Sequence, residues 1–76
     1  MSRYFFDILG EGYRPEYDYC GRDLPAPESA LHLAELMALD VAVKRDEEGG
    51  RYAVDVRNID GRRIFLVAVQ SLSMAA

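Results

Sequence analysis

The chain has one cysteine and one histidine, and these two side chains are the natural starting points for chemistry. Cys20 lies in the stretch DYCGRD, and a thiolate beside Arg22 would be a nucleophile. A cysteine nucleophile needs a base, and His32 lies twelve residues further on, inside a predicted helix. His32 and Glu35 are spaced like half of a metal site, but too few other ligands converge there. We therefore expect no enzyme activity, no metal and no cofactor, with Cys20 half-buried at a strand end and His32 exposed on a helix.

Three arginines gather around one predicted turn, in the stretch RNIDGRR. Arg57, Arg62 and Arg63 could bind phosphates or acidic side chains, as clustered guanidinium groups do. They could equally keep the edge of a β-hairpin from sticking to another sheet. The chain has 9 Lys and Arg against 13 Asp and Glu, a net charge of -4, which disfavours nucleic acid as a partner. An antitoxin-like or RNA-binding regulator that uses these arginines is therefore the alternative function, not the leading one.

Length and composition limit the remaining possibilities. A chain of 76 residues, 50% of them hydrophobic, predicts one small folded domain over residues 1–76. A single cysteine excludes an internal disulfide, and small domains without such a link often gain stability by associating. No apolar run of about 18 residues is present, so we expect no membrane partner. The stretch MSRYFFDILGEG lacks the cleavage pattern of a signal peptide, and we expect a cytoplasmic protein.

Alternation and turn signals predict four strands and one helix. RYFFDIL has the aromatic and β-branched composition of a strand, and EYDYC that of a shorter one. A run rich in Ala and Leu follows Pro27, which suits the first position of a helix. RYAVDVR and RRIFLVAV flank the hairpin turn NIDG. The expected fold is α+β in the order β-β-α-β-β, an antiparallel sheet with one helix packed on one face. Its strands are expected at about 3–9, 16–20, 51–58 and 62–69, its helix at about 27–44, and a frayed tail at 70–76.

Counting outward from the NIDG turn gives the expected register of the hairpin. The pairs that form the apolar inner face are then Val56 with Ile64, Val54 with Leu66, and Tyr52 with Ala68. The same register turns the intervening residues of the last strand to the opposite face of the sheet.

Two surfaces of this fold are more apolar than one helix and one sheet can bury. On the helix, a stripe opposite the core-facing side contains Leu36, Leu39 and Val43. On the back of the sheet, the expected register exposes Phe65 and Val67. These five residues are the candidate interface. The leading hypothesis is a non-enzymatic protein–protein interaction module that self-associates, most simply as a homodimer, or that binds another protein.

The order of the motifs resembles that of a family of short bacterial proteins classed as a domain of unknown function. The shared features are an RYFFDI-type first strand, the pattern D-x-x-G-x-[DE]-L-P, and an alanine-patterned helix. The matching positions are Arg3 to Ile8, Asp18, Gly21, Asp23, Leu24, Pro25, Ala30 and Ala34. The chain departs from the family at Ala26, where a small acidic helix cap is usual, and in its apolar outer helix stripe. The resemblance implies no activity, so no catalytic residue follows from it.

Overall fold

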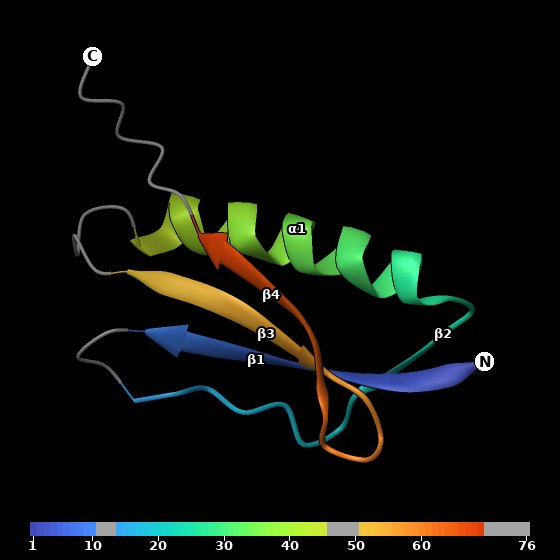
Figure 1. Cartoon of the computed structure of the whole chain (residues 1–76). Coiled ribbons are helices and arrows are strands. Elements are labelled where there is room, and N and C mark those ends of the chain that lie inside the picture. The colour runs from blue at the N-terminus through green and yellow to red at the C-terminus, as the bar shows by residue number, and fades with distance from the viewer. Residues whose placement is uncertain (11–13, 46–50, 70–76) are drawn as a thin grey trace.

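The computed structural model describes residues 1–10, 14–45 and 51–69, which form a four-stranded sheet and one helix (Figure 1). The elements, in chain order, are β1 (Ser2–Gly10), β2 (Arg22–Leu24), α1 (Pro27–Arg45), β3 (Tyr52–Arg57) and β4 (Arg63–Val69). The strands lie in the order β2-β1-β3-β4, and each neighbouring pair is antiparallel. The predicted α+β class is confirmed. The predicted frayed tail at 70–76 lies outside the described residues.

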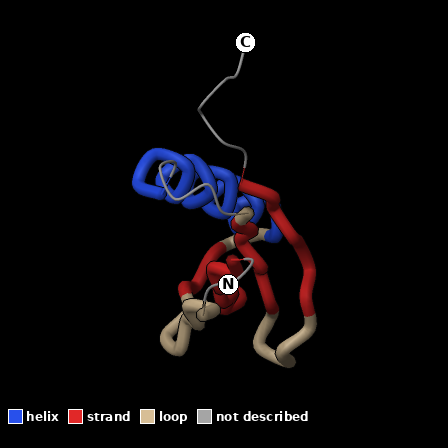
Figure 2. The backbone as a smooth tube through the Cα atoms, turned by 90° about the vertical axis from the view of Figure 1, so that its left-hand side faces the viewer, coloured by secondary structure: helices blue, strands red, loops and turns tan. Residues whose placement is uncertain are grey.

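The helix α1 lies on one face of the sheet, as the view along the strands shows (Figure 2). The core between them contains Tyr4, Phe6, Val54 and Val56 from the strands and Ala30, Ala34 and Ala38 from α1. Because alanine ends at Cβ, this side of α1 can lie close to the sheet, and the strands supply the bulk of the core. The other face, which we call the back face, is formed by the odd-numbered residues of β1 and β3 and carries the candidate site.

The prediction of a strand at 16–20 is wrong. A short strand at Arg22–Leu24 pairs with the start of β1 instead. Within 14–20, Glu16 forms one isolated bridge to Ile8. The chain then bends, and the carboxylate of Asp18 accepts the Phe6 N–H that a neighbouring strand would otherwise take. The Asp18 side chain thus replaces part of the backbone pairing between strands. The alternation of apolar and polar residues in the sequence does not predict such a replacement.

The register of the β3–β4 hairpin differs by one residue from the expected one. Next to the turn, Arg57 lies opposite Arg63, as counting predicts. One position further on, Val56 lies opposite Phe65 and not opposite Ile64. Ile64 is therefore the extra residue of a β-bulge, and such an insertion turns the rest of the strand to its other face.

The bulge changes which side chains of β4 reach the core. Phe65 and Val67 pack against the core beside α1, while Leu66 is exposed on the back face. The prediction that Phe65 and Val67 form part of an exposed apolar back face is therefore wrong. Their side chains no longer belong to the candidate interface, although β4 itself remains at the edge of the sheet.

Candidate functional site

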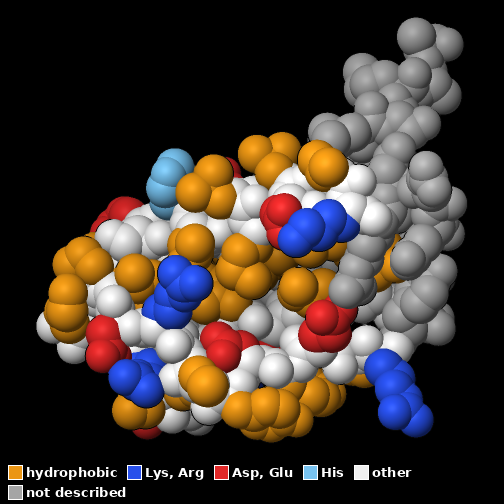
Figure 3. Space-filling model, turned by 180° about the vertical axis from the view of Figure 1, so that it is seen from behind, with side chains coloured by type: hydrophobic (Ala, Val, Ile, Leu, Met, Phe, Trp, Pro, Cys, Tyr) orange, Lys and Arg blue, Asp and Glu red, His pale blue; other side chains and the backbone are white. Residues whose placement is uncertain are grey.

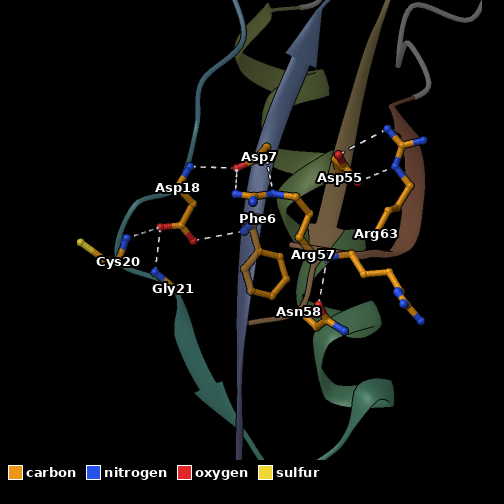
Figure 4. A network of polar contacts seen from close by, with 10 residues as sticks. Phe6, Asp7, Asp18, Cys20, Gly21, Asp55, Arg57, Asn58 and Arg63 are labelled. Carbon is orange, nitrogen blue, oxygen red and sulfur yellow. Dashed lines mark hydrogen bonds and ion pairs between the residues drawn. The ribbon is translucent and has the colours of Figure 1, made fainter. Parts of the chain in front are cut away.

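The back face of the sheet is the floor of a groove with a volume of about 630 Å3. One wall is formed by residues 17–19 of the segment 17–21, which runs alongside the outer edge of β1 and which we call the flanking segment. The other wall is the β3–β4 turn. Its hydrophobic lining consists of Phe5, Leu9, Tyr17, Tyr19 and Ile59. Its charged lining consists of Asp7, Asp18, Asp55 and Arg57. All four charged residues take part in the polar network of Figure 4.

Asp18 links the flanking segment to β1. Its Oδ1 accepts the N–H groups of Cys20 (3.1 Å) and Gly21 (2.9 Å), and its Oδ2 accepts that of Phe6 (3.1 Å). Burial raises the pKa of Asp18, but the N–H groups of Gly21, Phe6 and Cys20 outweigh it, so the pKa lies below its ordinary value. Asp18 is therefore charged at neutral pH and serves as a cap for three backbone donors.

Asp7 and Arg57 form an ion pair at the centre of the back face. Nε of Arg57 lies 2.7 Å from Oδ2 of Asp7, and its Nη2 lies 3.3 Å from Oδ1. The same Oδ1 accepts the backbone N–H of Asp18 at 2.9 Å. The Asp7 side chain is 3% exposed and that of Arg57 30% exposed, so these donors replace the water that the buried carboxylate has lost. The hydrogen bond to Asp7 raises the pKa of Arg57 above its ordinary value.

A second ion pair lies beside the first. Asp55 faces Asp7 directly across β1 and β3, a position where two like charges destabilise a sheet. Arg63 compensates Asp55 with Nε at 2.7 Å from Oδ1 and Nη2 at 3.3 Å from Oδ2. Each carboxylate of the facing pair is therefore matched by its own arginine. This arrangement makes the back face polar at its centre.

Two of the three arginines around the turn are thus engaged within the chain. Arg57 and Arg63 neutralise carboxylates of the sheet, whereas Arg62 is exposed and its backbone N–H donates to Asn58 Oδ1 at 3.0 Å. The sequence places all three at one turn, but the fold leaves them with different roles. Asp7 and Asp55 were the partners that sequence reasoning missed. The available signal was an acid at the middle of each of two otherwise apolar strands.

Cys20 and His32 do not come together as a catalytic pair. Cys20 is exposed and lies at a bend outside the strands, so the expectation of a half-buried strand-end cysteine is wrong. Figure 4 shows its sulfur pointing away from the polar network, while its backbone N–H and carbonyl are in use. His32 is exposed on α1. The ranges 1–10, 14–45 and 51–69 contain no group of acids, histidine and cysteine that could hold a metal ion.

The outer stripe of α1 is open to solvent, as the sequence predicts. Leu36, Leu39 and Val43 are 50%, 55% and 66% exposed. Seen from behind, the top of the molecule along α1 shows a row of exposed hydrophobic side chains (Figure 3). In the part of the chain that the structure describes, no helix is both long and apolar enough to cross a membrane.

Replacing Asp18 by Asn tests the cap and its pH dependence. The amide keeps one acceptor oxygen but turns an N–H₂ group toward a backbone donor, so we expect a loss of about 1–3 kcal/mol in unfolding free energy at pH 7. Because the folded pKa of Asp18 lies below the unfolded one, its stabilisation is present above pH about 4 and is lost as the pH falls through the folded value. The difference between the two proteins should therefore shrink in acid. Urea unfolding at neutral pH and at about pH 2.5 measures it.

The control for Asp18 is Asp23→Asn, at a carboxylate that pairs with Arg3 at the surface. Its pKa is also lowered, chiefly by the hydrogen bond from Arg3, but both side chains are about half exposed, at 52% and 45%. Exposed pairs contribute little, so its loss should be smaller than that of Asp18→Asn. Equal losses in the two variants contradict the role assigned to Asp18.

Comparison with known proteins identifies a family for the chain but assigns no activity to it. The model of a family described as a domain of unknown function (DUF6894) matches residues 3–70. No curated protein and no solved structure matches the chain.

Proposed function

This chain belongs to the DUF6894 family, and we propose that it is a non-enzymatic interaction module that forms a homodimer through the free edge of β4. The observation that carries the proposal is the position of β4. It is the last strand in the sheet order, so among the described residues no strand pairs with its outer row of N–H and C=O groups. Such an edge readily pairs with another strand unless charge or proline protects it. β4 has no proline, and its one charged residue is Arg63, at its start.

The backbone groups at this edge can be identified from β1. Phe6 and Ile8 direct their N–H groups away from β3, toward Asp18 and Glu16. Along an antiparallel strand, the backbone N–H and C=O groups of successive residues point alternately to the two neighbouring strands. The even-numbered residues of β3 therefore form hydrogen bonds with β4, and their partners in β4 are residues 65, 67 and 69. The N–H and C=O groups of Leu66 and Ala68 therefore point to the outer edge.

A two-fold axis at this edge joins two β4 strands in antiparallel fashion. The two copies of Arg63 then lie at opposite ends of the seam, so their charges do not meet, and the exposed Leu66 lies near its middle. The helix α1 packs on both β3 and β4. With strands about 4.8 Å apart, edge pairing brings the two helices to about 10 Å from each other, a distance at which helices pack. Strand pairing and helix contact together suit a small domain that lacks a disulfide.

The decisive experiment compares Leu66→Pro with Leu66→Thr. Proline removes the outward N–H at residue 66 without removing a hydrogen bond to β3. Threonine removes the same leucine side chain but keeps the N–H and suits a strand. At ~100 µM we expect sedimentation equilibrium to give a dimer for the wild type and Leu66→Thr, and a monomer for Leu66→Pro with an unchanged circular dichroism spectrum. A monomeric wild type at this concentration contradicts self-association itself.

The outer stripe of α1 is the competing surface, and a separate variant distinguishes it. Leu36 and Leu39 point away from the sheet, so Leu36→Glu with Leu39→Glu should leave an edge-paired dimer intact. A dimer that survives Leu66→Pro but dissociates in this double variant places the interface on α1 and contradicts edge pairing.

The nucleic-acid alternative has less support. Arg57 and Arg63 are already paired with carboxylates, which leaves Arg62 as the one arginine of the turn with an exposed side chain outside the described ion pairs. Retention on immobilised RNA at low salt that is lost in Arg62→Ala favours this alternative over a purely protein-binding role.

A further inference from the structure

We propose that the groove on the back face binds an arginine side chain presented by an apolar segment of a partner protein. The groove is lined by β1, β3, the flanking segment and the β3–β4 turn. The outer edge of β4 forms no part of this lining. The proposal is therefore independent of the homodimer, and each can fail without the other.

The rim of the groove exposes large hydrophobic side chains. Tyr19 is 85% exposed, Ile59 74% and Tyr17 54%. The rings of Tyr17 and Tyr19 lie edge to face with centroids 6.4 Å apart. Aromatic faces attract a flat cation, and an aliphatic side chain such as Ile59 can cover the stem that carries it. The rim thus fits both parts of an arginine side chain.

The floor of the groove already holds one guanidinium group in this way. The guanidinium carbon of Arg57 lies 5.6 Å from the centroid of the Phe5 ring, while its nitrogens bond to the carboxylate of Asp7. An aromatic face beneath and a carboxylate at the edge are the two contacts that arginine uses best. A second guanidinium group would find Tyr17 and Tyr19 in the aromatic role.

The charges of the groove favour a cation over an anion. Its lining has three carboxylates, Asp7, Asp18 and Asp55, against the one guanidinium of Arg57. Asp7 and Asp55 are each compensated by an arginine, whereas the described contacts of Asp18 are all with backbone N–H groups. Arg22 and Arg57 act on Asp18 only through their charges and not through an ion pair, so Asp18 is the least compensated carboxylate of the groove and lies beside the two tyrosines. The net charge of -4 on the chain acts in the same direction.

The test is a titration of the isotope-labelled full chain with acetyl-Leu-Arg-Leu-amide, followed by amide chemical shifts. Two matched peptides replace the arginine by glutamate or by citrulline, which has a similar shape but no charge. We expect saturable shifts at Tyr17, Asp18 and Ile59, and an affinity at least ~10-fold higher for the arginine peptide than for either matched peptide. Added salt should weaken this binding.

Two variants separate the groove from other surfaces. Tyr19→Ala removes a mostly exposed ring, so the fold should persist while affinity falls about 5-fold. Leu39→Ala, on the outer side of α1, should leave affinity unchanged. Equal affinity for the three peptides, shifts confined to α1, or no saturable shift up to ~10 mM peptide overturns the proposal.

Discussion

Gly21→Ala is expected to lower the free energy of unfolding by about 2–5 kcal/mol. The φ angle of Gly21 is 74°, in the left-handed region, where a residue with a Cβ costs about 1–2 kcal/mol. A Cβ would also lie 2.9 Å from Arg3 Cγ, 2.9 Å from Phe5 Cε2 and 3.0 Å from the Tyr4 carbonyl oxygen. Because the last atom belongs to the backbone of β1, the flanking segment would have to move away from β1, which adds about 1–3 kcal/mol of strain.

Gly61→Ala is the matched control for this prediction. Gly61 has a φ of 80°, but a Cβ there would meet nothing within 4 Å. Its expected loss is therefore about 1–2 kcal/mol, from backbone conformation alone. Urea unfolding followed by circular dichroism gives both values, and the difference between them isolates the contact of Gly21 with β1. Equal losses contradict the importance of that contact.

The contacts around Gly21 also explain why the residues of the D-x-x-G-x-D-L-P stretch stand at this spacing. Arg3 donates to both carboxylate oxygens of Asp23, at 3.0 and 3.1 Å, and to the Cys20 carbonyl oxygen at 3.0 Å. Asp18 binds the backbone of β1 and of the turn, and Gly21 fits against β1. The first strand and the D-x-x-G-x-D-L-P turn are therefore two halves of one structural contact. The motif holds the chain on the sheet before the helix begins, and its polar residues form hydrogen bonds that stabilise the fold.

Sequence reasoning was sufficient for the class of fold and for the inner faces of β1 and β3, but not for that of β4. Alternation separates Tyr4, Phe6, Val54 and Val56 from their neighbours, and these residues form the core with α1. The helix is evident because no glycine or proline interrupts its alanine-rich run, which extends from Pro27 to Arg45. Such local signals depend on composition and spacing within one element.

The features that were missed depend on contacts between distant segments. The bulge at Ile64 shifts the hairpin register by one residue, and nothing in the turn sequence marks it. Asp18 replaces a strand by bonding to Phe6, twelve residues earlier in the chain. The buried carboxylate of Asp7 is neutralised by Arg57, fifty residues away in the chain. A side chain that acts as a backbone partner, and a charge that is neutralised across the sheet, are visible only once the strands are paired.

The ion pair of Asp7 should give the other large effect. Arg57→Leu removes the group that neutralises a carboxylate with 3% exposure, and we expect a loss of about 3–5 kcal/mol in unfolding free energy. Arg63→Leu is the matched control, since it also removes an arginine from a carboxylate of the same face. The Arg63 side chain is 53% exposed and that of Asp55 10%, so water screens this pair more and its loss should be smaller.

A second substitution separates uncompensated charge from lost packing. Asp7→Asn removes the charge but keeps an oxygen that can accept the N–H of Asp18, whose bond to Asp7 is 2.9 Å long. If charge burial causes the loss in Arg57→Leu, the double variant Asp7→Asn with Arg57→Leu should be more stable than Arg57→Leu alone. If the lost contact between Arg57 and the Phe5 ring dominates, the double variant should be no more stable than Arg57→Leu. Urea unfolding of the wild type and the three variants decides between these causes, because the coupling free energy of the cycle is large only in the first case.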